Sequence, residues 1–143
     1  MNNAMYNKYK QINLTAPLIE MYTELIEKDE VTRKIFVYIG KKMAESIEPD
    51  TQTKIGATIN NIAKDLVVNR NVRIRGSAKF KVAQAQLDRK HVERIIHSLL
   101  LTGLCYYEQV GKTKVIYCTD RGIQVLRNIY SKEIEATQSL QNM

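Results

Sequence analysis

The sequence predicts a single, mostly helical α+β domain, and two neighbouring stretches carry that prediction. Between residues 88 and 102 apolar side chains recur at the i, i+3, i+4, i+7 spacing that places them on one face of a helix. Directly afterwards, Gly111-Lys112 separates two runs rich in Tyr, Val and Ile, which is the pattern of a tight β-hairpin. The length of 143 residues is enough for one domain with a real core.

The chain is basic, with 22 Lys and Arg residues against 15 Asp and Glu residues and a formal net charge of +7. This balance favours a polyanionic partner, either nucleic acid or an anionic membrane surface. No apolar run approaches the roughly 18 residues of a membrane-spanning helix, and the polar start MNNAMYNKYK lacks the apolar core of a signal peptide. We therefore expect a cytoplasmic protein, with Cys105 and Cys118 as reduced core residues.

Residues 1–28 are predicted to form an N-terminal arm and a helix. Residues 1–14 mix Asn, Lys, Gln and Tyr without a clear period, so we expect a partly disordered arm. Thr15 can cap the next helix, and Pro17 is tolerated in its first turn. The apolar stripe of this helix, predicted over 17–28, consists of Leu18, Met21, Tyr22, Leu25 and Ile26. We expect it to pack on the core or on a second subunit.

Residues 29–136 are predicted to form the main domain, which begins with a long helix. Asp29 is placed to cap this helix, and apolar residues continue at helical spacing until Pro49 forbids continuation. These signals predict a helix over 30–47.

A polar turn over 49–54 and then a brief helix are predicted next. Thr58 is placed to cap this helix because its hydroxyl can accept a free N–H of the first turn. The apolar face of the helix consists of Ile59, Ile62, Ala63 and Leu66.

A basic segment, residues 67–86, separates that helix from the next one. Residues 72–75 and 79–82 each alternate apolar and basic side chains around Gly76-Ser77, which predicts a small β-hairpin. Two alternatives stay open, a solvated or disordered loop and a lengthening of the following helix by residues 82–86. The segment has no acid between Asp65 and Asp88, and its five cations are Arg70, Arg73, Arg75, Lys79 and Lys81.

The helix predicted over 88–102 has clear signals at both ends. Asp88 can accept hydrogen bonds from the first turn, and Gly103 tolerates the left-handed conformation that follows a helix. Its apolar stripe consists of Val92, Ile95, Ile96, Leu99 and Leu100. The remaining face is largely cationic and consists of Arg89, Lys90, Glu93, Arg94 and His97.

The hairpin that follows has a predictable register. A two-residue Gly-X loop is what a type II′ turn requires, and pairing about Gly111-Lys112 sets Val110 opposite Thr113. The same register sets Cys105 opposite Cys118. The tip then presents Lys112 and Lys114, with Glu108 as the nearest acid.

A last helix is predicted over 121–136, where Thr119 and Asp120 can cap it. Its apolar stripe consists of Ile123, Leu126, Ile129, Tyr130 and Ile134. Because this stripe continues beyond what one small domain needs to cover, we expect the helix to hold a homodimer together. Residues 137–143 lack a stripe and are predicted to form a flexible tail.

Patterns for catalysis or metal binding are weak. His91 and His97 lie six residues apart and so point to different sides of a helix. Gly111-Lys112-Thr113 matches the end of a phosphate-binding loop, but the glycine which that motif requires five residues earlier is Tyr106 here. We therefore expect no enzyme, no metal and no cofactor.

From Glu30 to Tyr130 the order helix, strand, helix, helix, hairpin, helix resembles the winged helix-turn-helix superfamily. The best local match is TGLCYYEQVGKTKVIYCTDRG, in which a glycine ends the recognition helix, a Gly-basic pair forms the wing tip and Thr-x-x-Gly opens the next helix. The chain resembles bacterial regulators of the MarR and ArsR types, and also TubR-type adaptors of plasmid and phage partition. The resemblance implies that residues 55–57 form a short strand beside the wing and that TINNIAKDL is the positioning helix.

The resemblance and the charge together predict a sequence-specific double-stranded DNA-binding protein that acts as a homodimer, most simply a transcriptional regulator. The alternatives are a partition or replication adaptor that also binds a partner protein, and a pure protein-interaction module. The residues expected in the major groove are Arg89, Lys90, Arg94 and His97, and those expected on the backbone or in the minor groove are Lys112 and Lys114. Further phosphate contacts are expected from Thr58, Arg70, Arg73, Arg75, Lys79 and Lys81.

Overall fold

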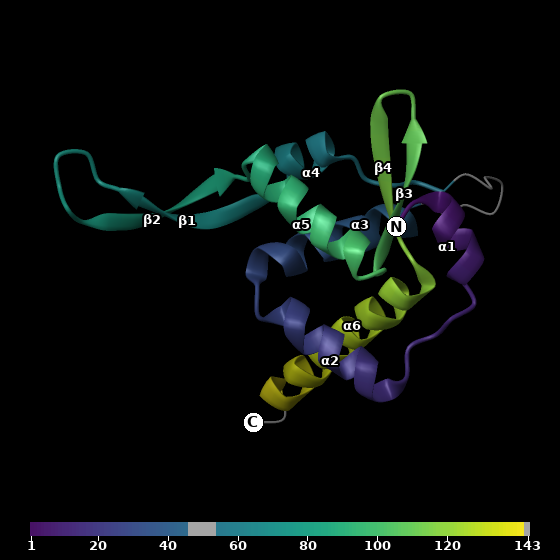
Figure 1. The fold of residues 1–143 in the computed structure, drawn as a ribbon. Coiled ribbons are helices and arrows are strands. Elements are labelled where there is room, and N and C mark those ends of the chain that lie inside the picture. Colours follow the sequence, from purple (N-terminus) through teal and green to yellow (C-terminus); the bar gives the residue numbers. More distant parts are fainter. Residues whose placement is uncertain (46–53, 142–143) are drawn as a thin grey trace.

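The computed structural model describes residues 1–45 and 54–141, without the side chains of Arg70 and Val72. These residues form a mostly helical α+β fold with six helices and two separate antiparallel hairpins (Figure 1). The helices gather into one body, and the two hairpins leave it in different directions. None of the described helices is long and apolar enough to cross a membrane.

The first helix, α1 (Asn3–Tyr9), corrects the prediction of an irregular arm over residues 1–14. The side chain of Asn2 caps it by accepting a hydrogen bond from the Met5 amide at 2.9 Å. Tyr6 is buried, and its ring stacks on that of Tyr106 with 3.9 Å between the ring centroids. Tyr6 is the one residue of α1 that is buried, and its aromatic partner lies 100 positions away, so the helix has no apolar period for sequence reasoning to detect.

The helix predicted over 17–28 is confirmed as α2 (Ala16–Glu27), and it packs along the last helix, α6 (Asp120–Gln141). The two helices cross below the rest of the body in Figure 1. α6 continues past residue 136 to Gln141, so residues 137–141, which were predicted to belong to a flexible tail, are helical and exposed. A helix can continue in this way because its hydrogen bonds are local and need no buried face.

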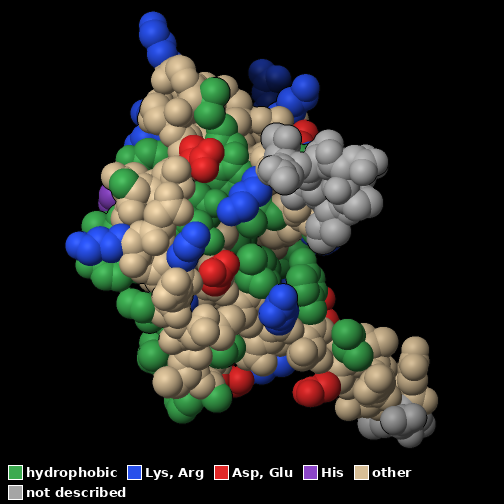
Figure 2. Space-filling model, turned by 90° about the vertical axis from the view of Figure 1, so that its right-hand side faces the viewer, with side chains coloured by type: hydrophobic (Ala, Val, Ile, Leu, Met, Phe, Trp, Pro, Cys, Tyr) green, Lys and Arg blue, Asp and Glu red, His purple; other side chains and the backbone are tan. Residues whose placement is uncertain are grey.

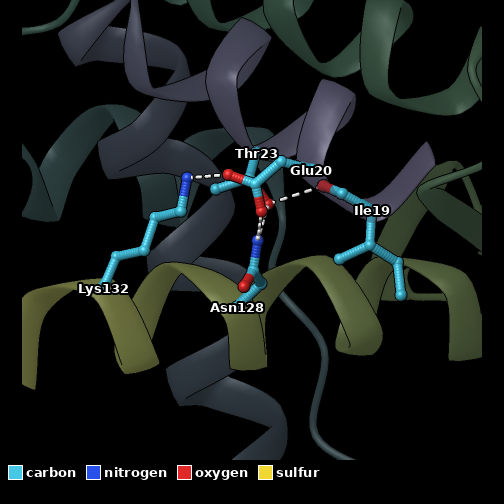
Figure 3. A network of polar contacts seen from close by, with 5 residues as sticks. All are labelled: Ile19, Glu20, Thr23, Asn128 and Lys132. Carbon is cyan, nitrogen blue, oxygen red and sulfur yellow. Dashed lines mark hydrogen bonds and ion pairs between the residues drawn. The ribbon is translucent and has the colours of Figure 1, made fainter. Parts of the chain in front are cut away.

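A polar network joins α2 to α6 (Figure 3). The Asn128 amide donates to Glu20 Oε2 at 3.1 Å and to the Thr23 hydroxyl at 2.9 Å. Thr23 is fully buried and donates in turn to the Ile19 carbonyl at 2.7 Å. Lys132 adds an ion pair with Glu20, and its hydrogen bond lowers the pKa of that carboxyl group. These contacts fix α2 against α6 without a partner chain.

The stripe of α6 that was predicted to dimerise is in large part core of the same chain. Leu126 and Ile129 are 5% and 0% exposed and pack in the main hydrophobic cluster. Ile123 and Tyr130 are half-buried against that cluster. Ile134 alone among these five residues is largely exposed, at 58%. The prediction missed this arrangement because the partner surface on α2 comes from a helix about 100 residues earlier in the chain.

The centre of the body is α3 (Glu30–Ala44), in which Ile35, Phe36 and Ile39 are fully buried. The start of the predicted helix is confirmed, whereas residues 46 and 47 and most of the predicted turn over 49–54 lie outside the described residues.

The short strand predicted over 55–57 is reduced to a single bridge, in which Ala57 and Ile116 exchange two backbone hydrogen bonds of 2.9 and 2.8 Å. After it, α4 (Ile59–Asp65) begins at Thr58. The Thr58 hydroxyl accepts from the Asn61 amide at 3.1 Å, which confirms the predicted cap.

The basic segment 67–86 is a β-hairpin, here called the arm, which projects from the body beside α4 and α5 in Figure 1. Its strands are β1 (Val67–Arg73) and β2 (Phe80–Gln86), paired from Val67 opposite Gln86 to Arg73 opposite Phe80. The predicted hairpin is confirmed, but β1 begins earlier and β2 ends later than predicted, and residues 74, 75 and 79 belong to the connection between the strands. The alternative in which residues 82–86 lengthen the next helix is wrong, because they are strand.

The helix and hairpin that anchored the sequence analysis are confirmed as α5 (Arg89–Leu101), β3 (Cys105–Val110) and β4 (Thr113–Cys118). Asp88 caps α5, and Gly103 follows it with a φ of 76°. The register of the hairpin is as predicted, with Cys105 opposite Cys118. Gly111 has a φ of 62°, and a positive φ is what the first central position of a type II′ turn requires. None of the described non-glycine residues has a positive φ.

Candidate nucleic-acid interface

The outward side of α5 carries a line of cationic side chains. At 100° per residue, Lys90, Arg94 and His97 fall within a narrow sector opposite the buried stripe that begins at Val92. All three are exposed and border an open hollow along the helix, together with Glu93 and others. Three of the four residues predicted to enter a DNA groove are therefore brought together on one helical face.

The fourth, Arg89, lies on the flank of α5 and lines a groove that joins three elements. The groove is lined by Thr58, Ile59 and Asn60 at the start of α4, by Arg89, and by Gln109, Lys112, Thr113 and Lys114 of the β3–β4 hairpin. The structure thus brings together Thr58, Arg89, Lys112 and Lys114, which were predicted from three separate places in the sequence. The described lining contains three cations and no acid, so the groove is suited to an anionic group.

Two of these cations have neighbours in the free protein. The Arg89 guanidinium lies 3.3 Å from Glu93 Oε1, one turn along the helix, in an exposed ion pair. The Lys114 ammonium lies 4.6 Å from the centre of the Tyr107 ring, which is a cation–π contact. Exposed pairs of these kinds contribute about 0.3–1 kcal/mol each, so either cation can exchange its partner for a phosphate at small cost.

The cations of the arm lie apart from this groove. Arg73 donates from Nε to the Ser77 carbonyl at 3.0 Å, which ties the end of β1 to the turn. Arg75, Lys79 and Lys81 are exposed at or near the far end of the arm. The structure therefore has two separate basic regions, the groove and the arm, and it does not describe the side chain of Arg70.

Figure 2 shows the side of the molecule turned away from the arm. Lys and Arg side chains are interspersed there with Asp and Glu side chains. In contrast, the lining of the groove between α4, α5 and the β3–β4 hairpin contains no acid, and neither does the sequence of the arm.

A stack of tyrosines, which the sequence pattern does not predict, supports the base of the β3–β4 hairpin. Tyr106 lies between Tyr6 of α1 and Tyr117 of β4, with centroid distances of 3.9 and 5.3 Å. Lys54 donates to the Tyr106 hydroxyl at 3.3 Å. Burial raises the pKa of Tyr106 to about 12, so the phenol is neutral at physiological pH. The Asn2 cap was the one local signal that could have revealed α1.

Cys105 and Cys118 face each other at the base of the same hairpin and are free thiols, both buried. Burial, and then a hydrogen bond with Cys118, raises the pKa of the Cys105 thiol well above its ordinary value. A protonated, buried thiol is a poor nucleophile and a poor metal ligand. In residues 1–45 and 54–141 no three His, Cys, Asp or Glu side chains converge as a metal site would need.

No protein-family model matches this chain, and neither a search of curated proteins nor a search of solved structures found a match. The candidate interface therefore rests on geometry and charge alone.

Proposed function

We propose that this protein binds double-stranded DNA in a sequence-specific manner as a winged helix-turn-helix protein, most simply as a transcriptional regulator. In this proposal α4 is the positioning helix, α5 is the recognition helix and the β3–β4 hairpin is the wing. The observation that carries the proposal is the groove in which Thr58, Arg89, Lys112 and Lys114 meet beside the cationic line of α5.

Each side chain has a role that follows from its chemistry. Arg94 presents a planar fork that can bond O6 and N7 of guanine in the major groove. Lys90 and His97 lie on the same line of α5 and can donate to neighbouring base edges or phosphates. Lys112 and Lys114 carry point charges on long, flexible stems, which suits phosphates of the backbone beside the wing.

The first test is direct binding. We expect the purified protein to bind a duplex selected from a random library, with an affinity that falls steeply as salt is raised from about 50 to 200 mM. Arg94→Ala should weaken binding to the selected site by roughly 1–3 kcal/mol and relax the preference at one base pair. Arg127→Ala removes the same charge from an exposed position on α6 and should change neither quantity, which makes it the matched control.

The wing is tested separately. Lys112→Ala should weaken binding to all sequences alike and lower the slope of log affinity against log salt by about one, because the variant neutralises one phosphate fewer. Absence of binding to any duplex at about 50 mM salt would overturn the proposal. Footprinting on neighbouring genomic DNA decides the role, since a regulator protects one or two sites whereas a partition or replication adaptor covers an array of repeats.

We further propose that the protein acts as a homodimer through α2. Leu18, Met21 and Leu25 lie at i, i+3 and i+7 on an exposed flank of α2 and are 41%, 45% and 57% exposed. Ile134 of α6 is a further exposed apolar residue. An isologous contact between two such surfaces would present two recognition helices to the DNA, which favours an inverted repeat as the target.

A further inference from the structure

The arm has two different faces. Side chains alternate along a strand, and directly paired residues lie on the same face of a hairpin. On the inner face, Val68 is 5% exposed and belongs to the main core, while Ala83 and Ala85 are half-buried. The opposite side, here called the outer face, is exposed along its length and carries Asn69, Asn71, Arg73, Phe80, Val82 and Gln84.

The outer face combines amides with apolar side chains that the described residues do not cover. Phe80 is 65% exposed and Val82 is 68% exposed, on a two-stranded ribbon that stands away from the body (Figure 1). Asn69 pairs directly with Gln84, and Asn71 with Val82. Exposed apolar groups on a thin ribbon with two free backbone edges favour association with another molecule, so this composition points to a ligand.

The charge of the arm indicates the kind of ligand. Five cations and no acid lie between Asp65 and Asp88. Two such arms would repel each other, which disfavours pairing of the arm with a second copy of itself. A polyanion would be attracted along the whole segment.

The shape of the arm matches one polyanion in particular. The major groove of B-form DNA is about 12 Å wide and accommodates a two-stranded β-ribbon. Asn and Gln side chains can form paired hydrogen bonds with N6 and N7 of adenine, and apolar side chains contact the methyl group of thymine. The outer face presents both kinds of group side by side, at Asn71 opposite Val82 and at Asn69 opposite Gln84.

We propose that the arm is a second base-reading element, which lays its outer face into the major groove and recognises A·T base pairs next to the site read by α5. This inference rests on the DNA binding proposed above and adds a specificity that α5 does not supply. β2 ends at Gln86 and α5 begins at Arg89, so the base of the arm adjoins the first turn of α5, and in this proposal the two elements read neighbouring base pairs. Arg75 and Lys79, near the far end of the arm, contact phosphates beside the groove.

The test compares two full-length variants in selection of binding sites from a random duplex library. The double variant Asn69→Ala/Gln84→Ala removes one cross-strand amide pair from the outer face. It should lose the A·T preference at the base pairs that these two amides read, keep the α5 block and bind the wild-type site about 5- to 150-fold more weakly for each base pair that is no longer read. Its salt slope should not change, because every cation that meets a phosphate is still present. Arg75→Ala is the control, and its expected result is the opposite. It should select the same DNA sequence as the wild-type protein, with a slope of log affinity against log salt that is smaller by about one.

Every outcome bears on the proposal. Since all three residues are exposed, thermal unfolding should be the same as for the wild-type protein, and this measurement separates a binding defect from misfolding. If the wild-type site has no block beyond that of α5, or if the double variant selects the same site, this inference is overturned while DNA binding by α5 stands. A double variant that binds DNA normally but loses self-association would assign the outer face to a second copy of the chain. If the wild-type protein binds no duplex, both proposals fall together.

Discussion

Thr119 and Gly122 form the junction at which β4 passes into α6. The Thr119 side chain is fully buried; its hydroxyl donates to the Gly103 carbonyl at 2.7 Å and accepts from the Gly122 amide at 3.0 Å. A Cβ atom at Gly122 would lie 2.1 Å from the Leu104 carbonyl oxygen. The Thr-x-x-Gly pattern seen in the sequence therefore has a physical basis, because the first turn of α6 packs backbone against backbone on the segment after α5.

Gly122→Ala should destabilise the protein by at least the roughly 1–3 kcal/mol typical of overpacking, because the backbone oxygen of Leu104 cannot move aside as a side chain would. Urea unfolding measured by circular dichroism checks this. Ser131→Ala, at an exposed position of the same helix, should leave stability within about 0.5 kcal/mol of the wild-type value. Equal stability of the two variants would show that α6 can shift away from Leu104.

At the scale of secondary-structure elements, α1 is held to the β3–β4 hairpin by the tyrosine stack. Tyr106 is 1% exposed, and its pKa is raised by burial to about 12 from an ordinary value of 10. The folded state therefore retains this proton at pH values where the unfolded chain loses it. By linkage, the stabilisation is fully present below about pH 10 and is lost as the pH rises from about 10 to 12.

We accordingly expect the free energy of unfolding to fall across that pH range, as measured by urea titrations at a series of pH values. Tyr106→Phe removes the ionisable group, so the decrease in the free energy of unfolding over this pH range should be smaller for the variant than for the wild-type protein. The remainder belongs to the other groups whose pKa values burial also raises, which are Tyr6, Tyr38, Tyr117, Tyr130 and Cys105. A fall of the same size in Tyr106→Phe would contradict the assignment of the titration to this ring.

The elements differ in how well the sequence predicts them, and the difference follows from the range of their contacts. α2, α5 and the β3–β4 register were predicted because their signals, such as the Asp88 cap and the Gly111 turn, are local. α1 was not predicted because the position of Tyr6 depends on stacking against Tyr106, which belongs to β3. The arm was predicted too short because β1 begins with Val67 and Val68 and continues with polar residues, so it does not alternate cleanly.

The candidate site was predictable to a similar degree. The cationic face of α5 followed from periodicity alone, and so its residues were named correctly as a group. The grouping of Thr58 with Arg89 and Lys112 could not be derived, since it depends on how three elements pack. The same limitation explains why Leu126 and Ile129 were assigned to a dimer, because a buried stripe and an interface stripe have the same period.

At the scale of the whole molecule, the proposed dimer makes a prediction of its own. Sedimentation at micromolar concentration should show a dimer, and Leu18→Gln/Leu25→Gln should convert it to a monomer that remains folded, because both side chains are exposed. The monomer should bind a single half-site and lose the preference for an inverted repeat. Leu140→Gln changes another exposed leucine, near the end of α6, and serves as the control. A wild-type protein that sediments as a monomer with and without DNA would contradict the prediction.

The pairing at the base of the arm has a consequence for how the chain folds. Val67 and Gln86 are directly opposite each other, so the two ends of the arm lie as close together as the ends of a short turn. An unpaired loop of that length would have to lose considerable entropy before α4 and α5 could meet. The two strands can pair starting from the turn, which brings the ends of the arm together. The conformational search that packs α4 on α5 is then no longer than that of two helices joined by a short loop. The arm could therefore gain or lose pairs of facing residues without slowing the assembly of the body.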